Sequence, residues 1–277
     1  MSDRRAPDET EFFSKDAIVR RINAEPAIML GAGRALLLQV AHPAVAQGVA
    51  DHSDFRTDPF GRLLGTVEAL NAVVFGSEQL ALEIGRRVQR IHEHVVGATY
   101  RANDIDSLVW VHATLCDSAL DARRRFVGPV DDDVTEAYYE QMKRVAAVFG
   151  VPSVALPPTW SDFRAFFDET VATLPVGDVG RRLAADIVQP PFPLALQVGL
   201  LPLTAFHRLV AIGTTPEPVR TRLGFRWKAS HRRALGSIET ASRAACAATP
   251  MAIRAAPTAL GSRLLLRYGR RSRTAHR

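Results

Sequence analysis

The sequence predicts an all-α protein folded as a single-domain helical bundle. Alanine, leucine, arginine and valine dominate, and 47% hydrophobic with 23% charged residues is the composition of an ordinary globular protein. Apolar residues recur at helical spacing over long segments, and no segment shows strand-like alternation or an internal repeat. No linker divides the chain. We therefore expect one helical domain over residues 10–262, a disordered N-terminus over 1–9 and a basic flexible tail over 263–277.

Capping residues and prolines mark where the expected helices begin. Ser, Thr and Asp side chains accept hydrogen bonds from first-turn amides, and proline fits the first turn because its missing N–H would be unpaired there. In chain order the starts are Thr10 or Ser14, Pro26, Pro43, Asp58-Pro59, Ser77, Asp104 or Asp106, Asp131 to Asp133, Trp160 and Trp227. The expected ends are Asn23, His42, Ala50, Gly76, Gly97, Phe126, Phe149, Thr173 and Ala248.

The longest apolar run, from Ala27 to Ala46, is expected to form a buried helix. It is apolar on almost every side, but Arg34, Gln39 and Pro43 interrupt it too often for a membrane span. Its GAGR sequence lacks the third glycine of a dinucleotide-binding loop and follows a helical pattern instead of a strand. These glycines are therefore expected to permit close helix packing.

The net charge of +6 is concentrated in the tail, whose last fifteen residues hold six arginines and no acid: Arg263, Arg267, Arg270, Arg271, Arg273 and Arg277. Because no nucleic-acid motif accompanies them, we expect no nucleic-acid partner and keep peripheral contact with an anionic membrane as an alternative. The N-terminus lacks the apolar core of a secretory signal. Cys116 and Cys246 have neither pairing nor metal-ligand spacing. We expect a cytoplasmic protein.

Two histidines of one helix, His92 and His94, are expected to face different surroundings. Two positions on a helix differ by about 200° around its axis, so the two rings cannot share a face. His92 falls in an apolar sector of small residues with Ala81, Gly85 and Val88, whereas the sector of His94 is charged. A neutral imidazole in an apolar sector can ligate a metal, and the small residues leave room for a flat group. A core histidine bonded to a backbone carbonyl is the alternative.

Other motifs are weaker. Neither histidine follows a glutamate by three residues, which argues against a ferritin-like di-iron site, and no phosphate-binding, zinc-protease or nucleophile-elbow motif occurs. Arg62 and Thr66 share an apolar stripe, where an arginine needs a carboxylate from the protein or an acidic group of a ligand. For His42, His52 and His112 the sequence favours structural roles, as loop or core histidines, over functional ones.

Several segments, in their order, resemble the oxygenase MpaB and rubber-oxygenase (latex clearing protein) family. The resemblance covers about Pro26 to Phe167 and is weaker beyond. It is carried by RALLLQVAHPAVAQGV, DHSDFRTDPFGRLLGT, RIHEHVVG, YRANDIDSLVWVHATLCDSAL, YYEQMKRVAAVFGVP and LPPTWSDFRAFF.

The resemblance implies a globin-like helical core that holds a non-covalent haem b. The family's proximal ligand is the histidine of an H-x-x-V motif, which here is His92 followed by Val95, so the sector of Ala81, Gly85 and Val88 would face the haem. The distal R-x-x-K-T motif of rubber oxygenases reads Arg62, Leu63, Leu64, Gly65 and Thr66. Glycine in place of the lysine implies an open or water-occupied distal position.

The resemblance therefore implies a haem-dependent oxygenase that uses dioxygen on a lipophilic, unsaturated substrate. His92 would ligate the iron, Arg62 would bind oxygen or a haem propionate, and Thr66 would relay a proton. A non-catalytic haem- or lipid-binding carrier or sensor is the first alternative, and a helical membrane-surface protein is the second. The sequence does not define an oligomeric state.

Overall fold

The computed structural model describes residues 10–52, 59–191 and 199–256, with the backbone alone for 59–64. These residues form α-helices and two short 3-10 helices, with isolated bridges but no β-strand among them. The prediction of a single all-α domain is confirmed. The predicted N-terminal segment 1–9 and basic tail 263–277 lie outside the described residues.

The helices follow the expected order. They are α1 (Ile18–Asn23), η1 (Pro26–Gly31), α2 (Ala32–Ala41), α3 (Pro43–His52), α4 (Pro59–Phe75), α5 (Glu78–Glu93), α6 (Ile105–Phe126) and α7 (Asp132–Val148). The second half contains η2 (Ser153–Ala155), α8 (Trp160–Thr173), α9 (Asp178–Val188), α11 (Leu201–Thr214), α12 (Glu217–Arg222), α13 (Ala229–Ala248) and α14 (Met251–Arg254). The sequence made no prediction of α9, α11 or α12.

Three predicted helices differ from the structure. The first, expected to begin at Thr10 or Ser14, begins as α1 only at Ile18, after a turn in which the amide of Ala17 donates to the carbonyl of Ser14. The segment expected as one helix from Pro26 to His42 begins with a 3-10 turn, η1, before α2 starts at Ala32. Helix α5 ends at Glu93 and not near Gly97, because the chain folds back in a tight loop. There the amide of Gly97 donates to the carbonyl of Tyr100, and the amide of Ala102 donates to that of Val95.

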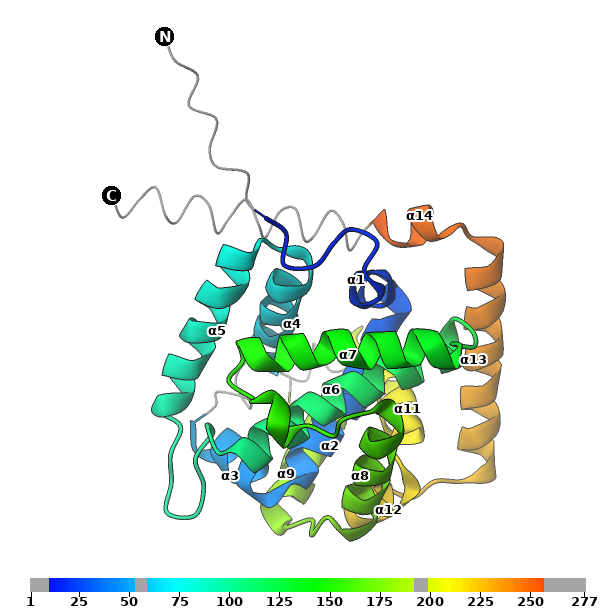
Figure 1. Cartoon of the computed structure of the whole chain (residues 1–277). Helices are drawn as coiled ribbons and strands as arrows, with labels where there is room; N and C mark the ends of the chain where they lie inside the picture. Colours follow the sequence, from blue (N-terminus) through cyan, green and yellow to red (C-terminus); the bar gives the residue numbers. More distant parts are fainter. Residues whose placement is uncertain (1–9, 53–58, 192–198, 257–277) are drawn as a thin grey trace.

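Helices α2 and α6 form the centre of the bundle. Helix α2 contacts α3, α6, α9 and α11, and α7 packs against α6 on its other side (Figure 1). The predicted role of the GAGR glycines is confirmed: a Cβ on Gly31 would lie 2.6 Å from the carbonyl oxygen of Ser118, and one on Gly33 would lie 2.6 Å from the Cβ of Ala211. Small residues therefore let η1 and α2 approach α6 and α11 closely.

Buried polar contacts fix the position of α6 against α2. Arg34 pairs with Asp117 at 2.5 Å, and its guanidinium also donates to the hydroxyl of Ser118 at 2.8 Å. The indole N–H of Trp110 donates to the carbonyl of Leu38 at 2.9 Å. Because both contacts join α6 to α2, they also set which face of α6 turns away from α2.

Helices α4 and α5 form a separate pair at the edge of the bundle (Figure 1). Ser77, between them, caps α5 by accepting a hydrogen bond from the amide of Leu80 at 3.3 Å. Both helices also contact α7. Their inner faces are thereby turned toward α7.

In the described part of the chain, no individual helix is both long and apolar enough to cross a membrane. One bent pair, Pro26–Ala41 with Pro43–His52 at 100°, meets the length and composition required when the two are taken together.

Candidate functional site

A cavity of about 1060 Å³ lies within the bundle, lined by residues of α2 to α7 and by the loop after α5. This volume slightly exceeds the range of about 300–1,000 Å³ for ligand pockets. Apolar side chains supply most of its walls, among them Val45, Val49, Leu70, Leu80, Ile84, Leu108, Val111, Leu115, Met142, Val145 and Phe149. Such walls favour a lipophilic ligand.

His92 lines this cavity from the last turn of α5. Val88, one turn earlier, and Val95, just after the helix, line it as well. His94 is exposed, and its Nδ1 lies 2.9 Å from the carbonyl oxygen of Arg90. The structure thus separates the two histidines as the helical spacing predicts.

Ala81 and Gly85 do not line the cavity. Ala81 is fully buried in the core, and a Cβ on Gly85 would overlap the carbonyl oxygen of Val148, at the end of α7. The sector of small residues on α5 therefore packs against α7, whereas the cavity meets the neighbouring sector with Val88 and His92.

Gly65 and Thr66 bring α4 to the same cavity as His92. A Cβ built on Gly65 would have no described heavy atom within 4 Å, so the position is spacious. Arg62 lies on the described backbone of α4, but its side chain is outside the described residues.

His112, which the sequence favoured as a structural residue, lines the same cavity from α6. Its side chain is 6% exposed, and its Nε2 has no hydrogen-bond partner among the described residues. Burial lowers the pKa of His112 to about 4, so the ring is neutral at neutral pH. An unpaired buried polar group costs about 1–3 kcal/mol. The only feature of the sequence that points to a functional role for His112 is its position within an otherwise apolar helical face.

Polar residues of α3 and of the loop after α5 line another part of the cavity. The hydroxyl of Tyr100 donates to Asp51 at 2.8 Å, and burial, together with Asp51, raises the pKa of Tyr100 to about 12. The Nε2 of His52 lies 3.1 Å from the carbonyl oxygen of Val96, which agrees with the structural alternative for this histidine. The exposed Arg87 and Arg101 also line the cavity.

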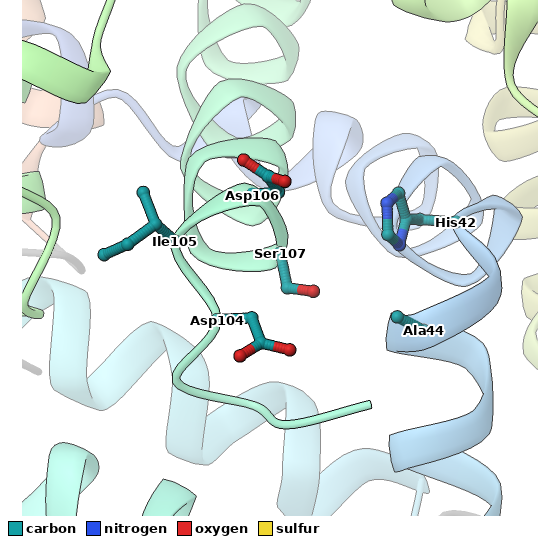
Figure 2. Close-up of a pocket in the computed structure, with 6 residues that line it drawn as sticks. All are labelled: His42, Ala44, Asp104, Ile105, Asp106 and Ser107. Carbon is teal, nitrogen blue, oxygen red and sulfur yellow. The ribbon is translucent and has the colours of Figure 1, made fainter. Parts of the chain in front are cut away.

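A second, smaller pocket of about 410 Å³ adjoins the cavity and shares Ala44 and Ser107 with it. Figure 2 shows the ring of His42 facing the side of α6 that carries Asp106 and Ser107, with Asp104 below. Burial lowers the pKa of His42, and the nearby Asp106 opposes this effect. Among the described residues, no group of three or more His, Cys, Asp or Glu side chains is arranged to hold a metal ion.

Comparison with known proteins places this fold and cavity in a family. Residues 19–249 match the family described as ER-bound oxygenase mpaB/B'/Rubber oxygenase, catalytic domain. The chain belongs to this family. The match includes every residue that lines the cavity and points to an oxygenase catalytic domain, and so to an oxidoreductase.

Two curated relatives are uncharacterized proteins of Mycobacterium bovis and Mycobacterium tuberculosis. Each is 24% identical to this chain over 210 residues, which cover 72% of the chain and 80% of the relative. No solved structure matches this mpaB/rubber-oxygenase family member at a significant level. The globin-like arrangement of its core stays a prediction.

Proposed function

We propose that this protein is a haem b-dependent oxygenase that uses dioxygen on a lipophilic, unsaturated substrate. The observation that carries the proposal is the large apolar cavity that His92, Val95 and Thr66 line together in a member of an oxygenase family.

The side chains that line the cavity fit a haem better than a metal ion held by protein ligands alone. A haem would need one side-chain ligand and apolar walls, because its own four nitrogens supply the remaining iron ligands. His92 supplies the imidazole, and Val88 and Val95 supply apolar surface on either side of it in the sequence. The volume of about 1060 Å³ favours a cofactor together with a substrate.

A haem held by one histidine would supply the chemistry of dioxygen binding and activation. His92 would hold the group, and the Oγ1 of Thr66 would donate a hydrogen bond or pass a proton on the opposite side. At Gly65 no side chain of the described residues fills the space beside Thr66. Arg62 keeps its proposed distal role, either toward oxygen or toward a haem propionate.

The apolar walls of the cavity have two roles in the proposed site. They bind the hydrocarbon part of the substrate, at roughly 25 cal/mol per Å² of buried apolar area. They also exclude water from the reacting groups, which strengthens every hydrogen bond and charge interaction within the cavity. Leu108, Val111 and Leu115 would carry out both roles from α6.

Oxygen uptake by the haem-reconstituted full chain tests the proposal. Squalene and squalane form a matched pair, since they differ only in their double bonds. We expect uptake with unsaturated lipophiles such as squalene and none with squalane. Haem-loaded protein that takes up no oxygen with any unsaturated terpene of a size range from ten to thirty carbons would contradict oxygenase activity.

A non-catalytic haem- or lipid-binding protein is the second candidate. The space around Gly65 favours it, because an open distal position also suits reversible binding of a gas. Reversible oxygen binding by the haem-loaded chain, without substrate oxidation, would be its signature. Substrate-dependent oxygen uptake would exclude it.

A further inference from the structure

His112 carries a hydrogen-bonding group that the oxygenase proposal does not use. It lies in the middle of α6, its side chain is 6% exposed, and its Nε2 has no partner among the described residues. Buried side-chain polar atoms in folded proteins are nearly always paired with protein or water. Because the residue His112 lines the cavity, a ligand in that cavity is the candidate partner for its unpaired ring nitrogen.

The surroundings of His112 define the chemistry of that partner. Leu108 and Leu115 lie one turn before and one turn after it on the same face of α6, and both line the cavity. Gln39, another lining residue, already donates to the hydroxyl of Thr114 at 3.2 Å. A ligand seated here has apolar surface on both sides of one hydrogen-bonding atom.

The charge state of His112 further limits which chemical groups can be its partner. Burial lowers the pKa of its ring to about 4, so the imidazole is neutral and has one N–H and one lone pair. A neutral ring cannot compensate a buried carboxylate or phosphate, whereas a hydroxyl or carbonyl oxygen needs no opposite charge. The charged lining residues Glu68, Arg87 and Arg101 are exposed.

We propose that Nε2 of His112 forms a hydrogen bond with a hydroxyl or carbonyl oxygen of the lipophilic ligand. The natural ligand would then be an oxygenated apolar molecule, an alcohol or ketone, and not a pure hydrocarbon. This inference rests on the proposed function for the lipophilic character of the substrate, but it does not depend on the haem. His112 is a specificity-determining residue in this account.

Farnesol and farnesene are suitable probes, because they share a carbon skeleton and differ mainly in one hydroxyl. Calorimetric titration of the full chain should show farnesol binding about tenfold more tightly than farnesene, the ratio expected for one hydrogen bond to a buried group. His112→Leu should remove this preference and His112→Gln should restore part of it. His94→Leu, the same substitution at an exposed histidine that does not line the cavity, should keep the preference.

The stability of His112→Leu separates this role from a structural one. Because the substitution removes an unpaired buried polar group, we expect its melting temperature without ligand to equal or exceed that of the wild type. An unchanged farnesol preference in His112→Leu would overturn the proposal, as would failure of the wild type to bind farnesol.

Haem spectroscopy keeps the two proposals apart. If the wild type binds no haem but His112→Leu still loses the farnesol preference, the oxygenase proposal fails and the role of His112 stands. If His112→Leu changes the absorption spectrum of bound haem as an iron ligand would, the hydrogen-bonding role is overturned.

Discussion

Gly85 on α5 packs against the carbonyl oxygen of Val148 at the end of α7, with no room for a Cβ between them. One turn later, the side-chain amide of Gln89 donates to the same carbonyl oxygen at 3.3 Å. Gly150, with a φ of +92°, then turns the chain away from α7. These contacts fix α5 against α7 and so fix where His92 meets the cavity.

Gly85→Ala should destabilise the fold. The added methyl forces α5 and α7 apart, at a cost of about 1–3 kcal/mol that exceeds the gain in helix propensity. Gly65→Ala is the matched control, because its Cβ would meet no described heavy atom and should raise stability by up to about 1 kcal/mol. Urea unfolding of both variants measures the difference, and equal effects would contradict the packing described here.

Asp117→Ala should destabilise the fold more than Gly85→Ala does. Asp117 pairs with Arg34, both side chains are 5% exposed, and Arg164 contacts the other carboxylate oxygen. The substitution leaves the buried guanidinium with only the more distant carboxylate of Asp121, at 3.8 Å, as a charge partner. Loss of a partner from a buried ion pair costs up to about 3–5 kcal/mol. Asp168→Ala, at the 64%-exposed end of the same network, should cost less than about 1 kcal/mol. Similar losses of unfolding free energy in the two variants would show that the buried Arg34–Asp117 pair stabilises the fold no more than an exposed ion pair does.

His112 should make stability depend on pH. Burial lowers its folded pKa to about 4, below the ordinary value near 6.5, so between these values the unfolded chain binds a proton that the folded chain does not. Stability is therefore present above pH 6.5 and is lost as pH falls toward 4. Between pH 7 and 4.5, His112→Leu should lose about 2–3 kcal/mol less than the wild type. The pH dependence of stability that remains in His112→Leu comes in part from His42 and His207, because burial also lowers the pKa values of these two histidines. Equal slopes in wild type and variant would mean that His112 does not stay neutral in the fold.

Thr66→Val should separate haem binding from turnover. The substitution keeps the shape of the side chain but removes its hydroxyl, so haem affinity should not change while oxygen uptake with substrate falls about 10²-fold. Thr66→Ser should retain most of the activity. A fully active Thr66→Val variant would exclude the hydroxyl from the reaction.

The sequence correctly predicted the features that depend on interactions between residues close together in the chain. Ser77 caps α5 and Asp104 precedes α6, because these signals act within one turn of the chain. The faces of His92 and His94 were predictable for the same reason, since helical spacing alone separates them. The end of α5 was not, because it depends on the loop in which Gly97 pairs with Tyr100.

Tertiary contacts explain the remaining differences. Small residues such as Ala81 and Gly85 can lie against a ligand or against another helix, and only the position of α7 decides between these roles. The missing partner of His112 is likewise a property of the assembled cavity, so the sequence alone could not distinguish this residue from a structural core histidine.

The ligation of haem by His92 is the central claim, and absorption spectroscopy of haem-titrated full-length protein tests it most directly. The wild type and His94→Ala should show the same Soret band at one haem per chain, because His94 points away from the cavity. In His92→Ala the band should be lost or strongly shifted, while the circular dichroism of the helices stays the same. A His92→Ala spectrum identical to that of the wild type, or a folded wild type that binds no haem, would contradict the claim.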